Sequence, residues 1–219
     1  MLDDLAVIDF ECVRGSNANV VSARALRELT PARQRNLLRY WLRRLGHARP
    51  NSVHVERILA DVVLAAPDKA PCVTWGNVEV RRYRDAVIAM LPLPDHDSDW
   101  IVPWDLGGLL ELPSDGGRLT TSVTPDGGIR PSQLNASVSV RYRRGGERCR
   151  LAAGAHRQEL KTLLQDWGVP PWLRDRVPLI YVGEHLAAVA DLCVCFPFQS
   201  EPGEPGIEVH WRRGPGFAF

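Results

Sequence analysis

The sequence predicts an α+β protein of two small domains, a helix-rich one with a few strands and then a strand-rich one with one main helix. A length of 219 residues accommodates two small domains. Apolar residues recur at helical spacing early in the chain and in short strand-like runs later. The composition, 45% hydrophobic and 24% charged, supports packed cores and excludes wholesale disorder.

Breaks in the pattern set the expected boundaries. Residues 1–28 show little periodicity and are interrupted by Gly15-Ser16-Asn17, so we expect a helical end and a connector from a preceding part. Residues 29–92 are expected to form the helical domain. The proline-bounded polar stretch 93–99 is expected to be a linker, and 100–219 the strand-rich domain.

The helical domain begins with a capped helix. Thr30 is a suitable N-cap, Pro31 suits the first helical position, and Gly46 suits the C′ position. A second helix is expected after Ser52. The buried face of the first helix is predicted to be Leu38, Trp41, Leu42 and Leu45, and that of the second Val55, Ile58, Leu59, Val62 and Val63.

Short strands complete the prediction. In the first domain, strands at 78–80 and 87–90 turn near Arg84 and Asp85. In the second domain, an amphipathic helix is expected at about 156–167, ended by Gly168. Its strands are expected at 100–104, 109–112, 119–123, 138–142, 179–182, 186–194 and 208–211.

Basic residues are concentrated in two zones although the net charge is only +1. The helix from Pro31 to Leu45 carries five arginines and no acid. Residues 138–176 hold nine basic residues against four acids. Arginine suits bidentate phosphate contacts, so the zones favour a polyanion-binding surface. The alternative for any single arginine is an ion pair with a nearby acid, or simple solvation.

No catalytic or metal centre is expected. The sequence contains neither G-x-x-x-x-G-K-[ST] nor G-x-G-x-x-G, and no G-x-S-x-G nucleophile elbow. Cys193 and Cys195 could supply two metal ligands from one strand, but no second pair follows nearby. The five cysteines are therefore expected to be reduced, with these two buried as apolar residues, in a soluble cytoplasmic protein without a membrane partner.

Two separated segments point to a known family. Residues 29–42 (LTPARQRNLLRYWL) resemble the opening of the substrate-recognition domain of tRNA(Ile)-lysidine synthetases. Leu160-Lys161, residues 168–174 (GVPPWLR) and residues 178–181 (PLIY) are similar to the C-terminal domain of the same family. One departure is Asp191, which stands where the family commonly has glycine.

The resemblance implies a function in tRNA modification. The family adenylates the wobble cytidine of a minor isoleucine tRNA with ATP, and lysine then displaces AMP to give lysidine. That chemistry belongs to an N-terminal ATP-pyrophosphatase domain with a Ser-Gly-Gly-x-Asp-Ser loop, which is absent from this sequence. The chain is thus expected to bind no cofactor and to be inactive alone. Its last domain is expected to share the fold of a phenylalanyl-tRNA synthetase β-subunit module.

The expected partner is tRNA, not DNA, and whether the chain forms a homodimer is left open. A stand-alone RNA-binding adaptor and a complete enzyme with an unrecognised site are the alternatives. The residues expected to contact tRNA are Arg33, Arg35, Arg39, Arg141, Arg143, Arg148, Arg157, Lys161 and Arg174.

Overall fold

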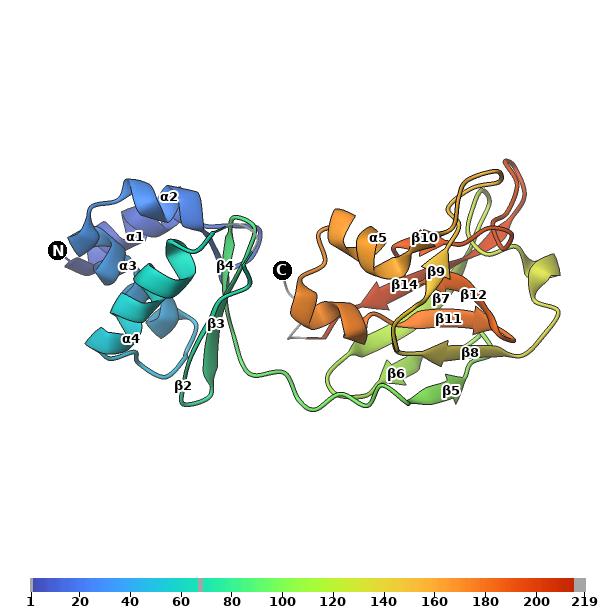
Figure 1. Cartoon of the computed structure of the whole chain (residues 1–219), viewed down its shortest axis with the longest axis horizontal. Coiled ribbons are helices and arrows are strands. Elements are labelled where there is room, and N and C mark those ends of the chain that lie inside the picture. Colours follow the sequence, from blue (N-terminus) through green and yellow to red (C-terminus); the bar gives the residue numbers. More distant parts are fainter. Residues whose placement is uncertain (1, 67–68, 215–219) are drawn as a thin grey trace. The chain divides into compact units, whose positions relative to one another are not determined.

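The computed structural model describes residues 2–66 and 69–214 and divides the chain into two compact units (Figure 1). The first unit runs to Leu93 and the second begins at Pro94. Both units contain helices and strands, which confirms the predicted mixture of the two in an α+β protein. Each unit is described by itself below.

Helices cover one antiparallel sheet in the first unit. The helices are α1 (Leu2–Val13), α2 (Ala23–Glu28), α3 (Pro31–Arg44) and α4 (Ser52–Arg57), which continues as the π-helix η1 (Ile58–Val63). The strands are β1 (Val20–Ser22), β2 (Cys72–Trp75), β3 (Val78–Tyr83) and β4 (Ala86–Met90), in the sheet order β1-β4-β3-β2.

The residues on the two sides of the predicted boundary between residues 28 and 29 share one hydrophobic core. Phe10 and Val13 of α1 belong to the same buried core as Leu38 and Trp41 of α3. Strand β1 adds to the sheet, with Val21 paired to Val87 of β4. Residues 2–28 are therefore an integral part of the first unit and not a connector. The sequence predicted a helical end here, but its weak periodicity hid the short helix α2 and the three-residue strand β1.

Helix α3 begins and ends where the sequence predicted. Thr30 is its N-cap and Pro31 its first residue. At the other end, Gly46 has φ +73°. The Gly46 N–H donates to Arg43 O at 3.0 Å and the His47 N–H to Leu42 O at 3.1 Å, which is the hydrogen-bond pair of a Schellman motif. The predicted buried residues of the second helix are also all buried.

The C-terminal carbonyls of the π-helix are capped by a buried arginine. Arg82 of β3 is only 3% exposed. Its Nη1 donates to Val63 O at 2.8 Å and to Ala65 O at 2.6 Å. Burial lowers the pKa of this guanidinium. Arg82 thus satisfies carbonyls that a helix end leaves without intrahelical partners.

The second unit is strand-rich. One sheet has the order β13-β12-β11-β8-β5 and a second the order β14-β7-β6, while β9 and β10 form a two-stranded ribbon. The strands are β5 (Ile101–Pro103), β6 (Leu110–Leu112), β7 (Gly117–Thr124), β8 (Val138–Arg141), β9 (Arg148–Cys149), β10 (Gln158–Glu159), β11 (Leu179–Val182), β12 (His185–Val189), β13 (Cys193–Val194) and β14 (Gly206–Arg212). Its helices are α5 (Leu160–Asp166) and the 3-10 turns η2 (Pro131–Gln133) and η3 (Pro171–Arg176).

Two predictions for this unit need correction. The helix expected from about residue 156 begins only at Leu160, because Gln158 and Glu159 pair with β9 as a strand. The strand expected over residues 186–194 is divided into β12 and β13 by a turn at Ala190, whose φ is +41°. The following residue, Asp191, is held by an ion pair with Arg213 at 3.0 Å.

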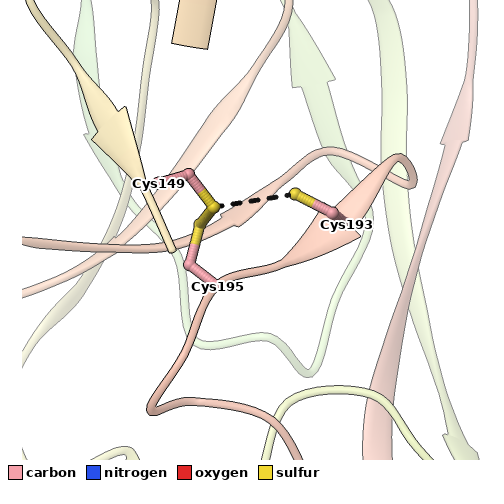
Figure 2. Close-up of side chains that lie close together, drawn as sticks. All are labelled: Cys149, Cys193 and Cys195. Atoms are coloured by element: carbon pink, nitrogen blue, oxygen red, sulfur yellow. Dashed lines mark hydrogen bonds between the residues drawn. A yellow bond between two sulfur atoms is a disulfide. The ribbon is translucent and has the colours of Figure 1, made fainter. Parts of the chain in front are cut away.

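The cysteines also differ from expectation. Cys149 and Cys195 form a disulfide, and Cys193 lies beside them (Figure 2). Cys12, Cys72 and Cys193 are free thiols. The structure thus joins two of the five cysteines that were expected to be reduced, because the fold brings Cys149 of β9 to the end of β13.

Trp41 offers a test of the core of the first unit. Its side chain is fully buried, and its Nε1 donates to Ala18 O at 2.9 Å. We expect Trp41→Ala to lower the free energy of unfolding by about 3–5 kcal/mol through the cavity it leaves. Trp41→Phe should cost about 1–3 kcal/mol, because the Ala18 carbonyl loses its donor.

Urea denaturation followed by far-UV circular dichroism measures both changes. Leu64→Ala is the control, since Leu64 is 64% exposed and should change stability by no more than about 0.5 kcal/mol. A Trp41→Ala variant as stable as this control would contradict the described core.

Candidate nucleic-acid interface

Most arginines of helix α3 are already neutralised within the chain. Arg33 pairs with Asp9 of α1, Arg35 with Glu56 of α4 at 2.5 Å, and Arg43 with Asp3 of α1 at 2.9 Å. The hydrogen bond from Arg35 holds the pKa of Glu56 below its ordinary value. The helix contains no acid of its own because neighbouring helices supply the acids. Its run of arginines is therefore weaker support for a polyanion than the sequence suggested.

The Arg33–Asp9 pair has a structural role. Asp9 is fully buried, whereas the Arg33 side chain is 40% exposed. The Arg33 Nε donates to both carboxylate oxygens, at 3.2 and 3.1 Å, and its Nη2 also contacts Oδ1. Since a buried carboxylate needs a charged or hydrogen-bonding partner, Arg33 is committed to joining α3 and α1.

Arg39 is the residue of this helix that keeps its charge available. It is exposed, and its guanidinium makes no hydrogen bond or ion pair with any residue in the described ranges. Arg44 has no acid partner there either, but it donates to the Tyr40 hydroxyl at 3.1 Å and lies over the Phe10 ring. The first unit thus offers a small basic surface centred on Arg39.

The second unit contains a basic pocket of about 480 Å³. Arg148 from β9, Arg150 just after it and Arg157 just before β10 all line this pocket. Arg148 and Arg157 are exposed. The sequence predicted Arg148 and Arg157 as tRNA contacts, and the structure brings them to one site. The remaining lining residues are Gln133, Asn135, Glu147, Tyr181, Glu184, His185, Leu186, Cys195, Phe196, Pro197 and Phe198.

The two carboxylates of the pocket are neutralised by arginines outside its lining. Glu184 pairs with Arg141 at 3.2 Å, and this hydrogen bonding lowers the pKa of Glu184. Glu147 pairs with Arg143 at 3.3 Å and accepts the backbone N–H of Gly145 at 2.9 Å. No ion pair among the described residues compensates the charges of the three lining arginines, which makes the pocket attractive to an anion.

Aromatic rings lie next to these charges. The Arg141 guanidinium lies 4.4 Å from the centroid of the Tyr181 ring, and the Arg150 guanidinium 5.8 Å from that of Phe196. Burial raises the pKa of Tyr181, so its phenol is neutral near neutral pH. Arg150 Nε is buried and has no hydrogen-bond acceptor among the described residues. Unpaired bases can stack on aromatic rings and on guanidinium planes.

The other predicted contacts of this unit divide into exposed and structural residues. Lys161 is exposed on α5 directly after buried Leu160, as predicted. Arg143 has a side chain only 13% exposed and contacts both Glu147 and Asp175. Arg174 is 8% exposed, and its Nε donates to Val169 O at 2.9 Å. Arg143 and Arg174 therefore stabilise the fold around η3.

Sequence reasoning missed Arg150, Tyr181 and Phe196 as members of the site. Arg150 lies in the basic segment 138–176 without a feature that distinguishes it, Tyr181 lies on β11, and Phe196 follows β13. No local pattern marks these three residues, because the pocket is assembled from β9, β11 and the segment after β13.

Two family models match the chain. "TilS substrate binding domain" matches residues 22–88, and "TilS substrate C-terminal domain" matches residues 138–211. Together they match more than half of the chain. The second match includes the arginines and aromatic residues of β8, β9 and β11.

Curated relatives bear one name. The tRNA(Ile)-lysidine synthase of Coxiella burnetii is 35% identical over 95% of this chain and 46% of its own length. That of Alkalilimnicola ehrlichii is 40% identical over 81% of this chain and 40% of its own length. The chain thus spans less than half the length of these relatives.

One solved structure, "Crystal structure of TILS C-terminal domain", is similar with a TM-score of 0.43 and 18% identity. It covers 52% of this chain and 98% of the other chain. Within residues 2–66 and 69–214, no helix is long and apolar enough to cross a membrane.

The structural role of Arg33 can be tested by a double-variant cycle. Arg33→Met leaves the Asp9 carboxylate buried without a partner, whereas Asp9→Leu leaves a half-exposed guanidinium that water can solvate. We expect Arg33→Met to lower the urea midpoint more than Asp9→Leu does, and the double variant to be more stable than Arg33→Met alone. If Arg33→Met leaves the midpoint unchanged but weakens tRNA binding, Arg33 is a tRNA contact and not a structural residue.

Proposed function

The chain belongs to the tRNA(Ile)-lysidine synthase family, and from this membership we propose that it is the part of such an enzyme that holds the tRNA. In this proposal it positions the minor isoleucine tRNA so that its wobble cytidine can be converted to lysidine with ATP and lysine. No phosphate-loop motif occurs in the 219 residues, so we place ATP and lysine in another part of the full enzyme. A tRNA partner places the protein in the cytoplasm.

The observation that carries the proposal is the uncompensated charge of the basic pocket. Arg148, Arg150 and Arg157 line it, while its two carboxylates are paired with Arg141 and Arg143. A folded RNA is recognised largely through its shape, its phosphates and unpaired bases that stack on aromatic or guanidinium planes. The pocket offers guanidinium groups for phosphates and, in Tyr181 and Phe196, aromatic rings on which bases can stack.

Each unit also carries a cation outside this pocket that is exposed. Lys161 on α5 follows Arg157 along the chain in the second unit, and Arg39 is an exposed cation on α3 of the first unit. We therefore propose Arg39, Arg148, Arg150, Arg157 and Lys161 as the tRNA contacts. Arg141 is proposed to orient the Tyr181 ring and to neutralise Glu184. The remaining predicted residues act through ion pairs and buried hydrogen bonds.

We expect the double variant Arg148→Gln/Arg157→Gln to bind the minor isoleucine tRNA more weakly than the wild type in a filter-binding assay. The affinity of the wild type should fall linearly with salt on logarithmic axes. The double variant should have a salt slope smaller by about 1–2, since about one ion is released for each phosphate contact.

Arg212→Gln is the matched control, because Arg212 is exposed on β14 of the other sheet and does not line the pocket. This variant should bind like the wild type. If Arg212→Gln lowered the tRNA affinity as much as Arg148→Gln/Arg157→Gln does, that result would contradict a localised site. The same assay with methionine tRNA separates the proposal from a general RNA-binding adaptor, which would show no preference between the two tRNAs.

A second prediction concerns catalysis by a complete relative. The chain, added to a full-length tRNA(Ile)-lysidine synthase, should inhibit lysidine formation by sequestering the tRNA. Inhibition should be relieved by excess tRNA but not by excess ATP or lysine, as product formation with radiolabelled lysine would measure. The Arg148→Gln/Arg157→Gln variant should inhibit less. Inhibition that only ATP relieves would show that the chain acts on another part of the enzyme.

A further inference from the structure

Three cysteine sulfur atoms meet at one point of the second unit. Cys149 comes from β9, Cys193 from β13, and Cys195 follows β13 by one residue (Figure 2). The Sγ atoms of Cys149 and Cys193 are 4.0 Å apart, and all three sulfur atoms lie within 4.8 Å of one another. Cys149 and Cys195 are buried, and Cys193 is half-buried. A disulfide uses only two of these sulfurs and leaves the third unexplained.

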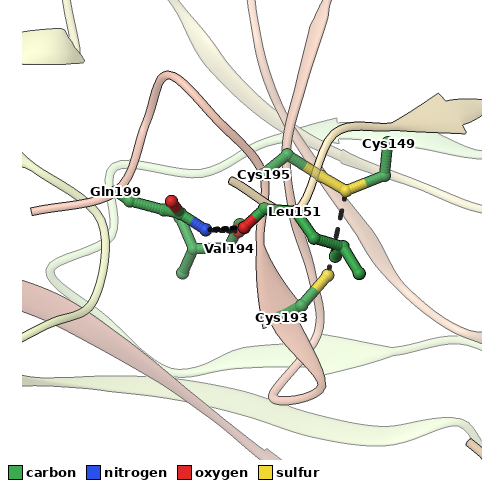
Figure 3. The surroundings of a disulfide bond; sticks show 6 residues. All are labelled: Cys149, Leu151, Cys193, Val194, Cys195 and Gln199. Atoms are coloured by element: carbon green, nitrogen blue, oxygen red, sulfur yellow. Dashed lines mark hydrogen bonds between the residues drawn. A yellow bond between two sulfur atoms is a disulfide. The ribbon is translucent and has the colours of Figure 1, made fainter. Parts of the chain in front are cut away.

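The backbone around the cluster is held in place by one side chain. Gln199 Nε2 donates to Leu151 O at 2.8 Å and to Val194 O at 2.7 Å (Figure 3). Leu151 is two residues beyond Cys149, and Val194 lies between the other two cysteines. The Cys195 N–H also donates to Ala187 O at 2.7 Å. The three sulfurs are therefore positioned by contacts that do not depend on a bond between them.

The cluster has an acidic approach from solvent. Cys193 lines a second pocket of about 260 Å³, which is also lined by Asp126, Asp191 and Glu208. Asp191 is paired with Arg213, but no ion pair within the described ranges involves Asp126 or Glu208. Carboxylates at a pocket raise the local concentration of cations. A divalent cation can thus reach the one sulfur that is partly open.

We propose that in its reduced form the chain binds one zinc ion through Cys149, Cys193 and Cys195, with water as the fourth ligand. Thiolates are soft ligands that favour zinc among the abundant divalent cations. Zinc–sulfur bonds of about 2.3 Å in tetrahedral geometry place ligand sulfurs about 3.8 Å apart. The Cys149–Cys193 separation of 4.0 Å already matches this spacing, and Cys195 has to move away from Cys149 once their bond is reduced.

The disulfide is the oxidised counterpart of this site. A thiol reductant supplies two electrons and two protons to the Cys149–Cys195 bond, which yields two thiols and the disulfide of the reductant. Zinc then displaces one proton from each of the three thiols, and these protons pass to solvent. That the reduced form predominates in the cell rests on the proposed function, because a tRNA-binding protein works in the reducing cytoplasm, where disulfides are rare.

The expectation of no metal site was argued from sequence neighbours. Cys193 and Cys195 lack further ligands nearby in the chain, whereas Cys149 lies 44 residues before Cys193. The fold supplies the third ligand, because the Phe196 N–H donates to Arg150 O at 2.7 Å and joins the segment after β13 to the segment after β9.

Zinc binding to the full chain tests the proposal. The chain is reduced with a phosphine, kept anaerobic, and titrated with Zn²⁺ against a chromophoric chelator. We expect one equivalent to bind, and Cys193→Ser to weaken binding more than about 100-fold. Even the loss of a residue that only hydrogen-bonds to a metal ligand lowers metal affinity about 10–100-fold. Co²⁺ in place of zinc should show the thiolate charge-transfer bands and intense visible bands of a tetrahedral site.

Cys12→Ser is the matched control, because Cys12 is an exposed thiol on α1 of the first unit, and it should bind zinc like the wild type. Zinc should also protect Cys149, Cys193 and Cys195, but not Cys12, from iodoacetamide in the wild type. This second measurement does not require a variant to fold. Reduced wild type that binds zinc no more tightly than Cys193→Ser, or uniform alkylation of all cysteines, would overturn the proposal. None of these readouts involves tRNA, so their failure leaves the proposed function untouched.

Discussion

Ion pairing within the chain decides which parts of this protein stay positively charged. An arginine that faces a carboxylate of its own fold has little charge left for an outside anion. Acids of α1 and α4 form ion pairs with Arg33, Arg35 and Arg43 of α3. In the second unit the same interaction has the opposite effect on the pocket, because Arg141 and Arg143 neutralise its carboxylates. The lining arginines Arg148, Arg150 and Arg157 have no ion pair among the described residues.

The predictions from the sequence succeeded where the determining interactions are local. The Schellman ending at Gly46 and the buried face of α3 depend on residues a few positions apart. Strands with regular alternation, such as β3, were also located. Arg82 on that strand looked like an ordinary polar position, however. Its burial against the end of the π-helix depends on a helix some 20 residues earlier, so no local pattern marks it.

The candidate site was predicted only in part, for the same reason. Segment charge located Arg148, Arg157 and Lys161, because exposure follows from the helix and strand pattern. Charge alone could not separate them from Arg174, whose side chain turns inward to Val169. Tyr181, Phe196 and Cys149 were missed because each gains its role from residues that lie far away in the sequence. A resemblance to a family supplied what local physics could not, namely the kind of molecule that we propose as the ligand of the basic surface.

The incorporation of α1 and β1 into the first unit has a consequence for protein engineering. A recognition module that is to be transplanted into another enzyme must carry every residue that completes its core. A fusion joint between residues 28 and 29 would separate Asp9 from Arg33 and remove Val21 from its place beside Val87. Chimeras of this module should therefore be joined before α1 and within the segment that follows β4, where no strand ladder is cut.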